Sequence, residues 1–186
     1  NTLRPIGGWR TRSDTASAGQ VRGLHSWIAN NSDRWIAAGS YNKLYAYSGA
    51  GARYDITPTG LTAGNEDALQ PVGYGNAFYG LEYYGIARQE VTTIVPATTW
   101  AMDSWGEYLV ACSSKDGKVY QWQLNTGTIA APVANAPVNN RSILVTEERF
   151  LMCLGAGGNP RLVQWSDREN NTVWTPAATN EAGSLE

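Results

Sequence analysis

The side chains that could take part in catalysis begin with one histidine and two cysteines. His25 is the only histidine of the 186-residue chain, so a multi-histidine metal site or a histidine-based relay has little to be built from. A cysteine nucleophile would need His25 as its base, and no motif around Cys112 or Cys153 supports that pairing. We therefore expect His25 to end a strand with an ordinary hydrogen bond, and both cysteines to pack as small apolar side chains.

Carboxylates are more numerous, and a glycosidase needs only two of them, about 5–10 Å apart. Most candidates fall in turns between predicted strands, where Asp and Glu are usually solvated and Asp bonds its local backbone. They are Asp103, Glu107, Asp116, Glu147, Glu148, Asp167 and Glu169. Because nothing marks any pair as desolvated, the sequence predicts no catalytic residue. We also expect no metal site and no cofactor.

The run Gly-Ala-Gly-Gly-Asn-Pro-Arg at 155–161 superficially suggests a phosphate-binding loop. It lacks the Gly-Lys-Ser/Thr ending of such a loop, and no helical pattern follows it. A hairpin turn explains this run better.

Composition excludes further classes of protein. Charged residues make up 16% of the chain, against about 25% in a typical soluble protein. Fourteen Lys and Arg against sixteen Asp and Glu leave a net charge of −2, which gives no basic footprint for nucleic acid. No apolar run is long enough for a transmembrane helix, and the first residues do not resemble a signal peptide, so we expect no membrane anchor.

Aromatic and turn-forming residues are abundant, with 8 Trp, 10 Tyr, 20 Gly and 8 Pro. Aromatic residues favour strands, Gly and Pro favour turns, and no long stretch has the spacing of an amphipathic helix. Three segments share one pattern: a strand, a tight turn, an apolar strand, a glycine-rich turn and an alternating strand. The middle strands, at 35–38, 108–111 and 150–153, are apolar without alternation, which is typical of strands covered on both faces.

Two details follow from this repeat. Cys112 and Cys153 lie one position out of phase near the ends of equivalent strands, so they should face opposite sides and form no disulfide. Asp116-Gly117 predicts a two-residue hairpin turn, whose type requires positive φ at both positions. Replacing Asp116, in a turn, should therefore affect stability far less than replacing Trp35 or Tyr108.

The spacing of the repeats predicts the architecture. Tyr108 and Phe150 are 42 residues apart, within the 40–45 residues of a propeller blade. We predict an all-β fold of propeller-type blades built from short antiparallel strands, with a β-sandwich as the alternative. Because three or four blades are too few for most closed rings, we expect a fragment of a longer protein. The predicted units are an extended N-terminal arm (1–23), blade-like repeats (24–60, 99–130 and 131–172), a divergent Gly/Tyr-rich blade or insertion (61–98) and the start of a further unit (173–186).

A glycine- and tyrosine-rich stretch at 73–85 lies between the first two repeats. Its glycines disfavour regular structure and its aromatic residues disfavour full exposure. A packed loop is one interpretation, and a contact surface for a partner subunit or a glycan is the other, since Tyr is enriched at interfaces. The candidate contact residues are Tyr74, Phe78, Tyr79, Tyr83 and Tyr84.

Several runs of this sequence resemble structural proteins of tailed-bacteriophage virions. They are residues 4–9, 34–39 with 43–45, 54–58, 105–112, 159–167 and 171–176. The resemblance covers most of the chain, and its nearest well-understood relatives are the propeller-bearing hub or nozzle proteins of short tails. Those proteins form a ring below the portal and adaptor, through which the genome leaves. The family supplies no catalytic residues.

This resemblance implies a location in the virion tail and contacts with copies of itself in a ring. It also implies contacts with other tail proteins, such as the adaptor, portal or fibre, and only transient, non-specific contact with DNA. The sequence therefore predicts one of two functions. One is a structural component of the tail, at a hub, nozzle or tip, that could line the DNA exit conduit. The alternative is a glycan-binding or glycan-cleaving module, such as a receptor-binding tail protein.

Overall fold

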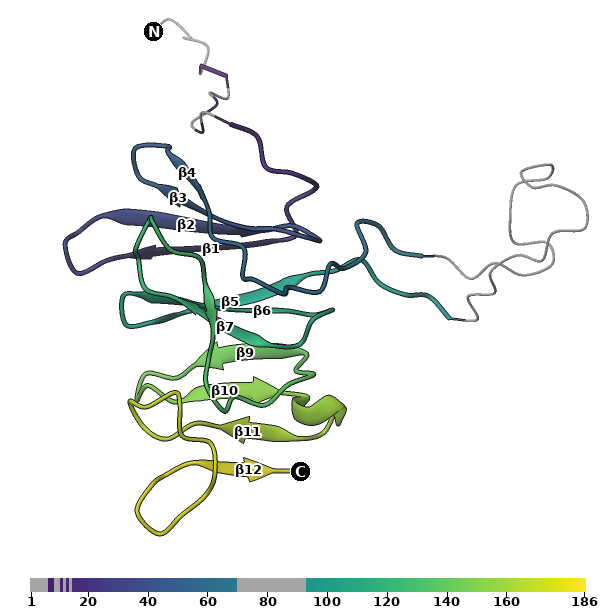
Figure 1. The fold of residues 1–186 in the computed structure, drawn as a ribbon, viewed down its shortest axis with the longest axis vertical. Helices are drawn as coiled ribbons and strands as arrows, with labels where there is room; N and C mark the ends of the chain where they lie inside the picture. The colour runs from purple at the N-terminus through teal and green to yellow at the C-terminus, as the bar shows by residue number, and fades with distance from the viewer. Residues whose placement is uncertain (1–6, 9–10, 12, 14, 70–92) are drawn as a thin grey trace, which may run out of the picture.

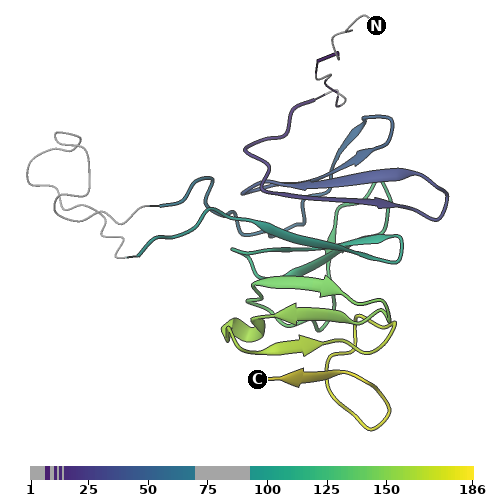
Figure 2. The same cartoon turned by 180° about the vertical axis from the view of Figure 1, so that it is seen from behind.

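The computed structural model describes residues 7–8, 11, 13, 15–69 and 93–186, and their fold is all-β, as the sequence predicts. It consists of three four-stranded antiparallel sheets and one short 3-10 helix, Ala156–Gly158. Each sheet is a meander in which the strands follow one another in chain order (Figures 1 and 2).

The strands of each sheet run from a long first pair to a short last strand. The first sheet contains β1 (Gly23–Ile28), β2 (Arg34–Gly39), β3 (Leu44–Ser48) and β4 (Arg53–Asp55). The second contains β5 (Trp100–Trp105), β6 (Tyr108–Ser113), β7 (Val119–Trp122) and β8 (Ala131–Pro132). The third contains β9 (Ser142–Val145), β10 (Leu151–Leu154), β11 (Val163–Trp165) and β12 (Gly183–Leu185).

The three sheets converge at their first strands. β5 of the second sheet contacts both β1 of the first sheet and β9 of the third. Among the described strands, no two of the last ones, β4, β8 and β12, are in close contact with each other, and β4 and β12 lie at opposite ends of the stack of sheets in Figure 1. The sheets therefore spread like a fan from β1, β5 and β9, with the second sheet between the other two.

Tryptophan rings dominate the core between the first and second sheets. Trp35 of β2 meets Trp122 of β7 edge to face, with ring centroids 5.3 Å apart and planes at 74°, a favourable arrangement for two aromatic rings. The ring of Trp100 fills the space above Gly39, where an added Cβ would lie 2.3 Å from its Cδ1. Its indole N–H donates to the carbonyl of Ser40 at 2.7 Å. Glycine is needed here so that the indole can reach the backbone.

The core between the second and third sheets contains both cysteines, which are free thiols. The side chains point to opposite faces of equivalent strands, as predicted. Because the sheets are stacked, however, opposite faces bring Cys112 of β6 and Cys153 of β10 into the same core instead of separating them. Burial raises the pKa of the Cys112 thiol to about 12 and also raises that of Cys153. Both cysteines are therefore protonated packing residues at neutral pH.

In the part of the chain that the structure describes, only the second sheet has its middle strand covered by a sheet on both faces. Leu109 and Ala111 of β6 face the first sheet, Val110 and Cys112 face the third, and none of the four is more than 1% exposed. In β2 and β10 the residues of one face are buried, whereas Ile36 is 45% exposed and Met152 is partly exposed. The expectation of cover on both faces is therefore wrong at Ile36 and Met152, although Ala38, on the same face as Ile36, is only 2% exposed.

The last strands of the second and third sheets shift the predicted boundaries, whereas β4 lies within the first predicted repeat (24–60). β8 lies within the predicted third repeat (131–172) but pairs with β7 of the second sheet. β12 lies in the segment expected to start a further unit (173–186), but it pairs with β11 and completes the third sheet. Between β4 and β5, an antiparallel bridge joins Leu69 to Val95. The choice between a divergent blade and an insertion at 61–98 rests on residues 70–92, which lie outside the described residues.

Among the candidate carboxylates, Asp116 differs most from expectation, since it was expected to be solvated in a turn. The connection between β6 and β7 runs from Ser114 to Lys118, and Gly117 (φ 68°) has positive φ whereas Asp116 does not. The Asp116 side chain is only 1% exposed. Its carboxylate accepts hydrogen bonds from the Tyr120 hydroxyl at 2.5 Å and the Thr62 amide at 3.1 Å. Burial pushes the pKa of Asp116 up, but these hydrogen bonds outweigh it and the pKa lies below its ordinary value. Tyr108, by contrast, is only partly buried.

We predict that Asp116→Asn lowers the free energy of unfolding by about 2 kcal/mol, because hydrogen bonds to a buried charged group contribute roughly 1.5–3 kcal/mol. Glu148→Gln is the matched control, since Glu148 is exposed in the turn before β10, and it should change the same quantity by less than about 0.5 kcal/mol. Urea unfolding followed by tryptophan fluorescence measures both. Equal effects of the two substitutions would show that the buried carboxylate does not contribute to stability.

Candidate functional site: the uncovered faces of the outer sheets

The first sheet has one face without a covering sheet, which we call the N-side face because it points away from the second sheet. Trp35 and Ala37 of β2 pack against the second sheet, so Ile36 and Ala38 between them point the other way. The strand register adds neighbours on the same face. Ile36 pairs with Ser26 and Tyr47, Ala38 pairs with Leu24 and Tyr45, and Arg34 pairs with Ile28.

Large apolar side chains of the N-side face are open to solvent. Leu24 is 69% exposed, Ile28 is 61% exposed and Ile36 is 45% exposed, and Val21, just before β1, is 38% exposed. Leu24, Ile28, Ile36 and Val21 line a groove of about 750 Å³, which also reaches Tyr47 and Arg34. Scattered exposed apolar residues are normal on a protein surface, but a contiguous group of them marks an interaction site.

A segment of the chain before β1 covers another part of the same face. The amide of Ala18 donates to the Tyr45 hydroxyl at 3.2 Å, and the Arg53 guanidinium donates to the carbonyl of Ala16. Arg53 also lies over the Tyr45 ring, 4.9 Å from its centroid. Tyr45 is consequently only 3% exposed. The N-side face is therefore buried where protein covers it and apolar where it does not.

The third sheet has a corresponding C-side face, which points away from the second sheet. Leu151 and Cys153 of β10 are in the core, so Met152 and Leu154 face outward. The register places Leu144, Trp165, Val163 and Leu185 on the same face. Leu185 is 68% exposed, and the other five are partly exposed. Trp165 lies over Gly183, where an added Cβ would be 2.4 Å from the ring.

Polar contacts connect the first strands of the three sheets. His25 Nε2 lies 2.8 Å from Ser104 Oγ, which joins β1 to β5. The Asp103 carboxylate accepts hydrogen bonds from the amide of Val145 at 2.7 Å, which joins β5 to β9, and from the amide of Ser104 at 2.8 Å. His25 also stacks on Trp27, with ring centroids 5.8 Å apart. Burial lowers the pKa of His25, and the nearby charge of Asp103 only partly opposes this.

Ser104, His25 and Asp103 are the three residue types of a serine hydrolase, but their arrangement serves a structural purpose. In a catalytic triad the carboxylate bonds the second nitrogen of the imidazole. The carboxylate oxygens of Asp103 instead accept hydrogen bonds from the backbone amides of Ser104 and Val145. As neighbours in a strand, Asp103 and Ser104 point to opposite faces of β5. The contacts therefore connect sheets and do not form a proton relay. Asp103 was expected in a turn and lies in a strand.

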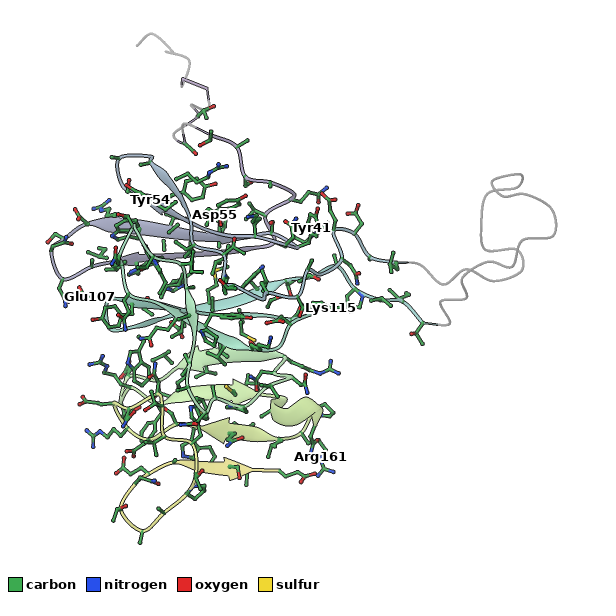
Figure 3. The ribbon with its side chains drawn as sticks, viewed as in Figure 1. Tyr41, Tyr54, Asp55, Glu107, Lys115 and Arg161 are labelled. Atoms are coloured by element: carbon green, nitrogen blue, oxygen red, sulfur yellow. The ribbon has the colours of Figure 1, made fainter. Side chains whose placement is uncertain are left out.

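The other candidate carboxylates are also dispersed. Glu107, at the turn after β5 (Figure 3), accepts the indole N–H of Trp27 through its backbone carbonyl at 2.9 Å. Asp167 accepts the amide of Glu181 at 2.8 Å, while Glu147, Glu148 and Glu169 are exposed. Across the part of the chain that the structure describes, no group of three or more His, Cys, Asp and Glu could hold a metal ion. Nor does that part contain a helix that is long and apolar enough to cross a membrane.

A second, more polar hollow of about 460 Å³ lies on the other side of the molecule from Glu107, near Lys115 (Figure 3). Lys115, Arg141, Thr98, Asn65 and Asn140 line it. Asn140 is 2% exposed and donates to the carbonyls of Gly117 and Pro137. Its Oδ1 is buried without a hydrogen-bond partner among the described residues.

The remaining sequence candidates fall into two groups. The run 155–161 connects β10 to β11 and contains the 3-10 helix, as expected for a hairpin connection. Tyr74, Phe78, Tyr79, Tyr83 and Tyr84 lie outside the described residues, so the contact surface predicted there stays a prediction. The two uncovered sheet faces were missed as a site. The sequence feature that could have indicated them is the apolar character of all three middle strands.

Comparisons of this chain with protein-family models, with curated proteins and with solved structures find no match.

The burial of His25 predicts a pH dependence of stability. Because its folded-state pKa lies below the ordinary 6.5, the unfolded chain binds the proton more readily. The free energy of unfolding should therefore fall as the pH drops through about 6.5 towards the folded-state pKa. His25→Gln should remove this fall, since His25 is the only histidine. Urea unfolding at several pH values between 7.5 and 5 measures the effect. An identical slope in both proteins would show that His25 is not the group responsible.

Proposed function

We propose that the three sheets are blades of a β-propeller-like assembly. Three features support this architecture. Each sheet is a four-stranded antiparallel meander, the chain passes from the last strand of one sheet to the first strand of the next, and the first strands lie together while the last strands diverge. A sandwich of two facing sheets would need neither the third sheet nor the fan-like spread.

The proposed function is that of a structural component of a bacteriophage tail, at a hub, nozzle or tip, acting through contacts with copies of itself and with other tail proteins. The observation that carries this proposal is the pair of uncovered apolar faces on the outer sheets. Leu24 on the N-side face and Leu185 on the C-side face are largely exposed in the single chain, and Ile36 on the N-side face is nearly half exposed. Such surfaces are costly in water and favourable in an assembly, where they are covered.

The character of the polar groups supports an assembly role as well. The hydrogen bonds of Asp103, Asp116 and His25 join elements of the fold to one another. A net charge of −2 is also suited to a conduit that DNA passes through, because a basic lining would bind phosphates and slow the passage. Contact with DNA in such a conduit would be transient and non-specific.

Labelling of phage particles tests the proposal. Gold-labelled antibodies raised against the purified protein should mark the tails of intact virions. Particles assembled without the protein should lack a complete tail and be non-infectious, because a structural ring cannot be bypassed. Mass spectrometry of purified virions could contradict the proposal. Absence of the protein from intact, infectious particles would overturn a structural role in the tail.

A glycan-binding module is the second candidate, and the polar hollow near Lys115 favours it. Lys115 and Arg141 line it and could donate hydrogen bonds to sugar hydroxyls, and Asn65 and Thr98 add further polar groups. The cleaving form of this candidate has no support of this kind, because the described carboxylates are dispersed.

Calorimetric titration with host-surface polysaccharide tests this second candidate. Lys115→Ala and Arg141→Ala should each weaken binding several-fold, since each removes a donor from the hollow. Arg168→Ala, in an exposed loop away from the lining residues, should leave binding unchanged. If the unaltered protein shows no heat of binding, the glycan function is wrong. Equal losses in all three variants would indicate non-specific charge attraction instead of a site.

A further inference from the structure

The two junctions between sheets inside this chain have the same direction. In each junction the C-side face of one sheet packs against the N-side face of the next. Trp35 and Ala37 of the first sheet meet Leu109 and Ala111 of the second. Val110 and Cys112 of the second sheet then meet Leu151 and Cys153 of the third. A sheet of this type is therefore built to accept one kind of neighbour on each face.

The outer sheets retain one unused face of each kind. Among the described residues, no sheet covers the N-side face of the first sheet, which carries a groove of about 750 Å³. Within the same part of the chain, no sheet covers the C-side face of the third sheet, which carries the partly exposed Met152, Leu154 and Trp165 and the largely exposed Leu185. These are the same two kinds of face that meet in both internal junctions. A contact between them would continue an arrangement that the chain already uses twice.

A second copy of the chain supplies both missing neighbours at once. Its third sheet can cover the N-side face of the first copy while its first sheet covers the C-side face. Such a contact joins unlike surfaces, and it closes into a ring when the rotation between copies returns to the start. The three sheets that the structure describes give six blades in two copies, within the typical range of four to eight, and nine in three copies, which exceeds it.

We propose that two copies of this chain associate head to tail, N-side face against C-side face, and close a six-bladed ring. The inference rests on the proposed role in assembly and names the partner of the uncovered faces. The closed dimer contains two equivalent contacts. A substitution that disrupts either face of the chain therefore disrupts both contacts.

Sedimentation equilibrium of the purified protein, over concentrations that extend to the millimolar range, tests the proposal. The expected mass is twice the 20.2 kDa of the single chain. Ile36→Glu, on the N-side face, and Leu185→Glu, on the C-side face, should each halve the mass, because each places a charge in the contact. Ile129→Glu is the matched control, since Ile129 is 46% exposed, like Ile36 at 45%, and lies in the loop before β8. It should leave the dimer intact.

The possible results separate the alternatives. Urea unfolding of the variants shows whether they are folded, which their exposed positions lead us to expect. A single-chain mass for the unaltered protein, or masses above the dimer, overturns the closed pair. Loss of the dimer in Ile36→Glu alone overturns the head-to-tail contact and indicates two N-side faces packed together. Gold labelling of virion tails is independent of these results, so a monomeric protein found in tails would refute only the dimer.

Discussion

The structure depends on one constraint: an antiparallel sheet that is apolar on both faces must be covered on both faces. The second sheet meets it completely, because Leu109 and Ala111 are buried by the first sheet and Val110 and Cys112 by the third. The outer sheets carry similar middle strands but receive only one cover each. Burying one large aliphatic side chain contributes roughly 1.5–3 kcal/mol. Leaving Leu24, Ile28, Ile36 and Leu185 in water forgoes several such contributions.

Specific polar contacts determine how the sheets sit on one another. Apolar surfaces alone allow sliding, whereas a hydrogen bond between two particular groups does not. Asp103 reaches the amide of Val145 from one face of β5, and Ser104 meets His25 from the other. Further out, the amide of Ala130 donates to the carbonyl of Ile56 at 3.0 Å, which connects the ends of the first and second sheets. Removing the side chain of His25, Ser104 or Asp103 would leave its partly buried partner without this hydrogen bond, and an unsatisfied group costs more the more fully it is buried.

The sequence allowed the all-β class and the first three strands of each sheet to be predicted, because apolar runs and glycine turns are local signals. The last strands were missed since β8 has two residues and β4 and β12 have three, too few to show alternation. Asp116 was misjudged because its partner Thr62 lies 54 residues away, and no local pattern reports such a contact. The exposed faces of the outer sheets were missed for a similar reason. An apolar strand does not reveal whether its cover comes from the same chain.

The two uncovered faces differ in shape, and the difference bears on how they are used. The N-side face of the first sheet is hollowed, and its groove is lined partly by the small residues Ala38 and Gly51. The C-side face of the third sheet carries the large side chains of Met152, Trp165 and Leu185. The internal junction between the first two sheets is shaped the other way round, because Trp100 on the N-side face of the second sheet is seated where Gly23 and Gly39 leave room on the C-side face of the first. Large side chains fit a hollow better than they fit one another, because close packing requires complementary shapes. In both cases a face with large side chains meets a face with room for them, so geometry favours contacts between unlike faces.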